Sequence, residues 1–432
     1  MTMRIRDSDL VASPSQLQDA RVTKAFPGAS DRTDEMAFPA IAQCELSIVM
    51  PCLNEAETIG RCIAKANEWL ASRGVTGEVV IGDNGSTDGS IEIARGLGAR
   101  VVHVKSRGYG AALDGAIRAS HGQLVIVGDS DDSYDFSSLD LFVERLREGW
   151  ELVMRNRFKG GIRPGAMPWK NRYVGNPVLS WIGQTLFQIR ERDFHCGIRG
   201  FTRDGYDRLN LATSGMEFAS EMVIKARYYG LRTCEVPTVL WPDGRSRPPH
   251  LRPWRDGWRH LRFMFLFAPR WLFFYPGALL AATGAVLLAA LLRGPIQVAG
   301  VSLDIHAMLF AALALIAGFE SMTFGILGKT VAIRIGAHPV TPLSRWFEDH
   351  ASTELVSALG IVMALAGGGV LGRAVVEWSR VGFGAYDPTH GMRLVIPGAA
   401  LVMLGLQTIL MALLLGVTRL PTRAQASETR TD

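Results

Sequence analysis

The chain has 432 residues, of which 48% are hydrophobic and 20% are charged, and its 46 basic and 41 acidic residues give a net charge of +5. Such a length accommodates two or three domains. So small a positive excess, with no basic strand interleaved with aromatics and no zinc-finger spacing, gives no support to a nucleic-acid partner. The five cysteines form no Cys-x-x-Cys pair, which indicates reduced thiols rather than a disulfide framework or a zinc site.

Residues 1–43 are polar and show no periodicity, so we expect a mostly disordered tail without a secretory signal. From residue 44 to about 250 the pattern alternates between strand and helix, which predicts parallel β-α-β units with right-handed crossovers. The predicted strands are 46–51, 78–82, 101–104 and 123–128, and the predicted helices are 57–72, 90–96 and 110–120. We therefore expect an α/β domain with a mostly parallel sheet over residues 44–250.

Polar clusters follow three of these strands, at 51–55, 83–89 and 129–131. Because ligands of open α/β sheets bind at the carboxyl ends of the strands, we expect the three clusters to converge on one site. Asp129 and Asp131 place two carboxylates there, which suits a hard divalent cation that keeps substrate phosphates as partners. Asp-x-Asp alone is also typical of a turn, so the prediction depends on the convergence of the clusters.

The C-terminal part of the chain is apolar. Four stretches, near 275–292, 306–328, 354–372 and 394–416, are each long enough to cross a hydrocarbon core about 30 Å thick. A large buried helical core is the alternative, but the Gly and Ala on their faces favour membrane spans. We expect a transmembrane domain of four helices at 274–418 and a tail at 419–432. The basic connections favour the cytoplasm for both termini, although the third connection is also basic.

Residues 251–273 join the two parts and have the pattern of an amphipathic helix. Arginines recur on one face and apolar residues on another: Arg252, Arg255, Arg259 and Arg262, with Trp254, Trp258, Leu261 and Phe265. This pattern is typical of a helix in the membrane interface, and a domain-packing helix is the alternative. Glu320 lies deep in the second span, where charge is costly. We expect it to face the bundle interior or a partner, within one protomer or between protomers of a homo-oligomer.

Residues 46–250 resemble family 2 glycosyltransferases of the GT-A fold, in particular the dolichyl-phosphate mannose synthase and polyprenyl-phosphate glycosyltransferase branch. Five motifs carry the resemblance in family order, at 49–55, 83–89, 129–131, 193–199 and 244–247, and they span about half of the chain. The resemblance implies a GT-A nucleotide-sugar-binding domain. It implies inverting transfer from GDP-mannose or a UDP-hexose to an undecaprenyl- or dolichyl-type phosphate at the cytoplasmic face of the inner membrane.

The resemblance also implies roles for individual residues. The nucleotide would be held by Pro51, Asn54, Glu55, Asp83, Gly110 and Asp129. Mg²⁺ or Mn²⁺ would be held by Asp129 and Asp131, where it neutralises the charge of the donor diphosphate. The other catalytic residues would be Arg157, Arg172, Asp193 and Arg199, and the lid over the diphosphate would be Arg245, Ser246 and Arg247.

The acceptor decides whether a general base is needed. A polyprenyl phosphate is a phosphomonoester with a second pKa of about 6, so it is already a dianion near pH 7 and needs orientation rather than deprotonation. Arg157 and Arg172 are the expected phosphate contacts, because a guanidinium fork suits phosphate. Glu217 lies where hydroxyl-accepting relatives place their base, and its role stays open.

Two other readings remain at this level. A processive polysaccharide synthase or a glycolipid glycosyltransferase would share the fold, but the Gln-x-x-Arg-Trp signature of the synthases is not matched, since Pro342 precedes Arg345 and Trp346. A non-catalytic membrane scaffold with an inactive transferase domain is the alternative from another class, and the intact aspartates and arginines argue against it.

Overall fold

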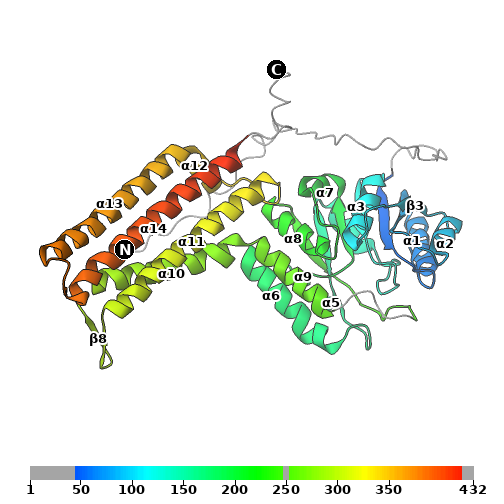
Figure 1. Ribbon diagram of the computed structural model, residues 1–432. Coiled ribbons are helices and arrows are strands. Elements are labelled where there is room, and N and C mark those ends of the chain that lie inside the picture. Colours follow the sequence, from blue (N-terminus) through cyan, green and yellow to red (C-terminus); the bar gives the residue numbers. More distant parts are fainter. Residues whose placement is uncertain (1–43, 247–252, 421–432) are drawn as a thin grey trace, which may run out of the picture. The chain divides into compact units, whose positions relative to one another are not determined.

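The computed structural model describes residues 44–246 and 253–420. The expected tail at 1–43, the predicted lid residue Arg247, the bridge residue Arg252 and residues 421–432 lie outside this part of the chain. Within it, the predicted succession of strands, helices and apolar spans is present (Figure 1).

Seven strands of the described residues form one sheet in the order β3-β2-β1-β4-β6-β5-β7. Their bounds are β1 Leu46–Cys52, β2 Gly77–Asp83, β3 Arg100–His103, β4 Leu124–Val127, β5 Leu152–Asn156, β6 Arg199–Thr202 and β7 Thr233–Pro237. The pairs among β1 to β4 are parallel, as predicted, and β7 is parallel to β5. Strand β6 runs antiparallel between β4 and β5, a reversal that the sequence pattern did not predict.

Both faces of the sheet are covered. In β1, Ile48 and Met50 belong to one apolar core and Val49 to the other, since successive side chains of a strand point to opposite faces. The covering helices are α1 Ile59–Arg73, α2 Ser90–Gly96, α3 Tyr109–Ala119, α4 Asp140–Arg147, α5 Arg157–Gly160, α6 Asn176–Phe187, α7 Arg203–Leu209 and α8 Phe218–Tyr228, with a π-helical turn η2 at Asn171–Gly175. This double cover explains why the strands read as continuous apolar runs.

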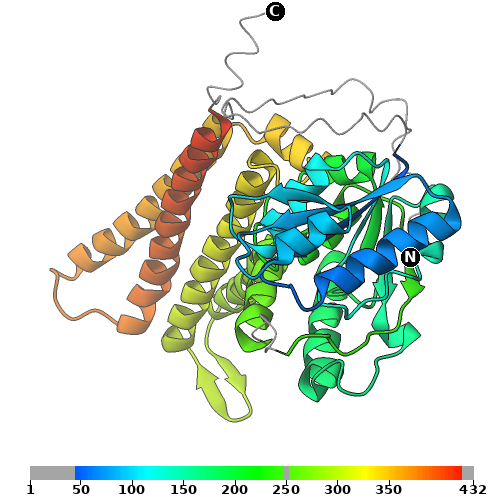
Figure 2. The same cartoon turned by 90° about the vertical axis from the view of Figure 1, so that its right-hand side faces the viewer.

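Among the described residues, four helical stretches are long and apolar enough to cross a membrane. They are η3 with α10 (Arg270–Phe274, Tyr275–Leu291), α11 (Ile305–Arg334), α13 (Thr353–Arg380) and α14 (Pro388–Arg419). The hairpin of β8 (Ile296–Val298) and β9 (Val301–Leu303) joins α10 to α11 (Figure 2), and α12 (Pro342–His350) precedes α13. The multi-pass membrane region is therefore confirmed.

Glycines let these helices approach closely in pairs. A Cβ at Gly277 of α10 would lie 2.7 Å from the carbonyl oxygen of Gly318 in α11. A Cβ at Gly367 of α13 would lie 2.7 Å from the carbonyl oxygen of Gly398 in α14. Small residues at such crossings are the usual basis of helix packing in lipid. Glu320 is exposed on α11, so the expectation that it faces the bundle interior is wrong and the alternative of a partner remains.

Helix α9 (Pro253–Leu266), which joins the two parts of the chain, has features of both a domain-packing helix and a membrane-interface helix. Asp256, His260 and Met264 are buried, and Met264 joins the apolar core of the sheet domain. Trp254 and Trp258 are 85% and 61% exposed on the other side of the helix. One face thus packs as in an ordinary domain, and the exposed tryptophans suit the membrane interface.

Candidate active site

The three polar clusters meet at the carboxyl edge of β1, β2 and β4, as predicted. Strand β1 pairs in parallel with both β2 and β4, so the three strands end side by side. The loops are also joined directly, because the Ser130 hydroxyl donates to the carbonyl oxygen of Pro51 at 2.7 Å. The Thr58 hydroxyl donates to the carbonyl oxygen of Ser130, also at 2.7 Å. These bonds hold the loop of the two aspartates against the loop after β1.

Asp129 and Asp131 lie at the centre of this edge. The Tyr109 hydroxyl donates to Asp129 Oδ1 at 2.9 Å, and the Ser133 amide and hydroxyl donate to Asp131 Oδ1 at 3.0 and 2.6 Å. The pKa of Asp129 is raised to about 6, chiefly by burial and next by the charge of Asp131, while the Tyr109 hydrogen bond and the charge of Arg245 oppose the shift. A raised pKa here reflects anions held together out of water, an arrangement that favours a bound cation.

The chemistry of this carboxylate pair fits a divalent cation shared with a substrate. In the described ranges, no cluster of three or more His, Cys, Asp or Glu side chains is placed to hold a metal by itself. Mg²⁺ is commonly held by one or two carboxylates and by substrate phosphates, for which a pair is sufficient. Gly197 keeps space beside the pair, since a Cβ there would lie 2.3 Å from Oδ2 of Asp129.

Replacing Gly197 with alanine should displace the Asp129 carboxylate and lower turnover about 100-fold, because a shift of about 1 Å at a reacting centre has effects of that size. The same change at Gly96, where a Cβ meets nothing within 4 Å, should leave turnover unchanged. Initial rates of the glycosyl transfer that the sequence resemblance implies, measured with the two purified variants, test this. Equal rates would show that the Asp129 position is unimportant.

A cleft of about 270 Å³ lies next to Asp131, because Arg245, which bonds Asp131, is one of its lining residues. Its lining residues are Asn54, Glu55, Glu57, Thr87, Asp88 and Arg245. Asn54 adopts a left-handed backbone (φ 58°), which asparagine tolerates better than most residues, and its Oδ1 accepts from the Thr87 amide at 2.8 Å. This bond connects the first two polar clusters. The structure thus brings together two residues predicted for the nucleotide, Asn54 and Glu55, with the predicted lid residue Arg245.

Asp83 and Asn84 shape the loop after β2. Asp83 is buried and accepts from the Ser86 amide at 2.9 Å, with His103 Nδ1 at 3.1 Å. Burial by itself would raise the pKa of Asp83, but the hydrogen bonds from Ser86 and His103 lower it below the usual value. Asn84 accepts from one backbone amide and donates to two carbonyl oxygens within residues 104–108, so an aspartate there would lose two hydrogen bonds.

Gly110 was predicted to approach the nucleotide, and the structure shows a different close approach. A Cβ there would lie 2.5 Å from the carbonyl oxygen of Thr213 and 2.9 Å from that of Gly215. The glycine is therefore needed for packing of α3 against residues 213–215. Its contact with the nucleotide stays a prediction.

Asp193 and Arg157 form a buried ion pair rather than two separate ligands. The Arg157 side chain donates from Nε and Nη2 to the two carboxylate oxygens of Asp193 at 2.7 and 2.6 Å, and its amide donates at 2.8 Å. The Asp193 carboxyl is fully buried. Glu235 supports the pair by accepting from the Asp193 amide at 3.1 Å. This double fork fixes the orientation of the guanidinium at the end of β5.

Arg199 and Arg172 differ in their surroundings. Arg199 is 2% exposed and donates to three backbone carbonyl oxygens, those of Cys196, Phe194 and Ala219, which makes it a positioning residue for the 193–199 motif. Arg172 is half-buried in η2, with its guanidinium 5.4 Å from the ring centre of Tyr173. Arg172 is therefore the more accessible of the two.

The sequence reasoning missed several residues that organise this edge. Tyr109 bonds Asp129, Gly197 leaves room for it, and Tyr134 accepts from the Gly197 amide at 3.0 Å. Glu235 was missed as well. Its position in β7 gave no motif signal, and its hydrogen bonds lower its pKa although burial would raise it. Gly197, in contrast, lies within the 193–199 motif and could have been singled out.

The fold and the site together define a nucleotide-sugar transferase domain of the GT-A type, followed by membrane helices. Residues 47–209 match the family described as Glycosyl transferase family 2, and residues 326–419 match the Glycosyltransferase family 2 C-terminal transmembrane region. The low-salt glycan biosynthesis hexosyltransferase Agl6 of Haloferax volcanii is 35% identical over 376 residues, covering 86% of this chain and 88% of the relative. The chain therefore belongs to glycosyltransferase family 2 and is a glycosyltransferase, which removes the scaffold alternative.

Other relatives cover the catalytic part. The dolichyl-phosphate hexose transferase of Haloferax volcanii is 31% identical over 193 residues, covering 45% of this chain and 81% of the relative. Among solved structures, glucosyl-3-phosphoglycerate synthase from Mycobacterium tuberculosis in complex with Mn²⁺ and UDP-glucose is 25% identical, with a TM-score of 0.41. That match covers 52% of this chain and 79% of the synthase.

Proposed function

We propose that this enzyme transfers a hexose from a nucleotide-diphosphate sugar, GDP-mannose or a UDP-hexose, to a polyprenyl phosphate. The observation that carries the proposal is the aspartate pair at the sheet edge, beside a cleft lined by Asn54, Glu55 and Arg245, in a chain with four membrane helices. The relationship to an enzyme named dolichyl-phosphate hexose transferase supports the acceptor class.

The donor would lie in the cleft with its diphosphate at the aspartates. A divalent cation held by Asp129 and Asp131 would supply charge neutralisation for the departing nucleotide. Glu55 and Asp83 carry carboxylates at the ends of β1 and β2, where they would accept from ribose hydroxyls and base N–H groups. The protein itself orients the donor. Its fold also holds the carboxylates of Asp129 and Asp131 close together although they repel each other.

The acceptor needs no general base in this scheme, because a phosphomonoester dianion is itself the nucleophile. Glu217, the carboxylate considered above as a possible base, is engaged, since it pairs with Arg259 at 3.0 Å. Arg172, and Arg157 as oriented by Asp193, would hold the acceptor phosphate.

Exposed aromatic side chains support the proposal that the acceptor phosphate reaches the site from the bilayer. Just before η2, and on η2, α6 and α9, several rings are more than half exposed, namely those of Trp169, Tyr173, Trp181, Trp254 and Trp258. Tryptophan and tyrosine favour the membrane interface, where one end of the ring is apolar and the other is hydrated. We propose that the catalytic part lies at the cytoplasmic face of the inner membrane.

The direct test is transfer of label. Full-length protein in detergent, given Mn²⁺, radiolabelled UDP- or GDP-hexoses and undecaprenyl phosphate, should move label into the lipid phase. Undecaprenol without phosphate should accept none, because its hydroxyl is not ionised near pH 7 and would require a base. Transfer to undecaprenol would overturn the acceptor class, and no transfer from any common UDP- or GDP-sugar would overturn the proposal.

A further inference from the structure

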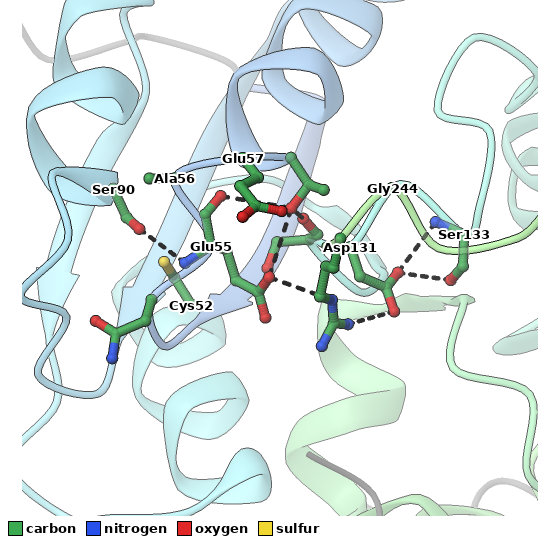
Figure 3. Close-up of polar contacts among 12 residues, drawn as sticks. Cys52, Glu55, Ala56, Glu57, Ser90, Asp131, Ser133 and Gly244 are labelled. Carbon is green, nitrogen blue, oxygen red and sulfur yellow. Dashed lines mark hydrogen bonds and ion pairs between the residues drawn. The ribbon is translucent and has the colours of Figure 1, made fainter. Parts of the chain in front are cut away.

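The segment of residues 241–246 is fastened over the carboxylate edge (Figure 3). The Gly244 amide donates to the carbonyl oxygen of Asp131 at 2.9 Å, and the Trp241 amide donates to that of Ser133 at 3.1 Å. At its end, the Ser246 amide and hydroxyl donate to the Glu57 carboxylate at 2.7 and 2.5 Å. The segment is thus held against the loop of Asp131 and against Glu57.

Arg245 is the centre of this closure. Its Nη2 donates to Asp131 Oδ2 at 2.5 Å, and its Nε lies 3.3 Å from Glu55 Oε2. The side chain is only 9% exposed, and Nε is buried without a hydrogen bond, so its contact with Glu55 is an ion pair only. The guanidinium therefore sits between two carboxylates that the proposed function assigns to the metal and to the nucleotide.

This contact uses the remaining oxygen of Asp131. Its Oδ1 already accepts from the Ser133 amide and hydroxyl, and its Oδ2 accepts from Arg245. A divalent cation at Oδ2 would meet a guanidinium at hydrogen-bond distance, where like charges repel strongly because little water separates them. A donor diphosphate changes this balance, since its oxygens can accept from Arg245 while they also bind the cation.

We propose that Arg245 is a resident counter-ion of Asp131 and Glu55 that competes with the divalent cation, so that the cation enters together with the donor diphosphate. The inference rests on the proposed function and adds an order of binding to it. In the donor-free enzyme the guanidinium neutralises the carboxylates. When the donor arrives, Arg245 moves from Asp131 to the diphosphate, and the cation takes its place at Oδ2.

The test measures Mn²⁺ binding to the full-length protein by the electron paramagnetic resonance signal of free Mn²⁺, with no nucleotide, with UDP and with GDP. The variants are Arg245→Gln and, as a matched loss of charge, Arg145→Gln, whose exposed side chain pairs with Glu148 at 2.7 Å. Without nucleotide, Arg245→Gln should bind Mn²⁺ about tenfold or more tightly than wild type, by analogy with the proton, whose affinity for a carboxylate falls about tenfold or more beside an arginine. Arg145→Gln should match wild type.

Equal Mn²⁺ affinities of wild type and Arg245→Gln without nucleotide would overturn the inference, provided that both proteins unfold at the same temperature. Should Arg245→Gln fold poorly, Arg245→Lys keeps the charge and should bind Mn²⁺ as weakly as wild type, and tight binding by it would also overturn the inference. If no form binds Mn²⁺ even with nucleotide, the inference falls with the metal site, whereas label transfer to lipid tests the proposed reaction independently.

Discussion

Replacing Asp131 with asparagine should lower sugar transfer to polyprenyl phosphate about 100- to 1,000-fold, the usual effect of removing one charge-stabilising group from an active site. Asparagine keeps an oxygen that can accept from the Ser133 amide and hydroxyl, so the turn at residues 131–133 should survive. What it loses is the negative charge that would hold the cation. The effect should therefore appear in the rate and in Mn²⁺ binding, with only a modest fall in the unfolding temperature, because Arg245 loses Asp131 but keeps its contact with Glu55.

Asp135 provides a matched control for this substitution. Its carboxylate accepts from the Ser137 amide at 3.0 Å and hydroxyl at 2.7 Å, the same turn that Asp131 makes with Ser133. Asp135→Asn removes one charge from the same loop without touching the proposed cation. The rate of Asp135→Asn should stay within about twofold of wild type. The corresponding change in activation free energy is well below RT ln 10, the change that corresponds to a tenfold difference in rate. Equal losses in the two variants would indicate a general role of loop charge and contradict a metal at Asp131.

Replacing Asp193 with asparagine should destabilise the catalytic domain by about 3–5 kcal/mol, the usual cost of leaving one partner of a buried ion pair without its counter-charge. The Asp193 carboxyl is fully buried and accepts three hydrogen bonds from Arg157. An uncharged amide has only one acceptor oxygen for these donors, and the guanidinium would keep its charge out of water. For a domain of this size the unfolding temperature should fall by about 10 °C.

Glu148→Gln is the control for the stability measurement. Glu148 pairs with Arg145 at 2.7 Å, and both side chains are about half exposed, at 52% and 45%. A surface pair of this kind contributes about 1 kcal/mol or less. Thermal unfolding of the full-length variants in detergent, followed by tryptophan fluorescence, compares the two. A fall for Asp193→Asn no larger than that for Glu148→Gln would show that the pair with Arg157 is not important for stability.

The local parts of this architecture could be read from the sequence because they depend on short-range patterns. Alternating apolar strands and amphipathic helices place Asp129 and Asp131 at the end of β4, and parallel pairing brings the loop at 51–55 beside them. Long apolar runs likewise locate the four membrane helices to within a few residues of their cores. In each case the deciding quantity is the periodicity of burial within one element, which neighbouring residues carry by themselves.

The partners of the charged groups could not be read in this way. Arg157 bonds Asp193, 36 positions away, and Arg245 bonds Asp131, 114 positions away, and neither partner was predicted from the sequence. The antiparallel insertion of β6 between β4 and β5 places Asp193 near Arg157 and Gly197 against Asp129. Which buried arginine pairs with which carboxylate depends on how segments that are distant in the sequence pack against each other and exclude water.

The sequence by itself therefore determined the α/β domain, the membrane helices, the family and the aspartate pair, since these follow from local periodicity and from motifs. Only the tertiary structure decided that Arg157 is bound to Asp193, that Arg199 holds backbone carbonyls, and that Arg245 neutralises Asp131 and Glu55. The physical reason is desolvation. A buried charge must find a partner, and the available partners are defined by packing rather than by spacing along the chain.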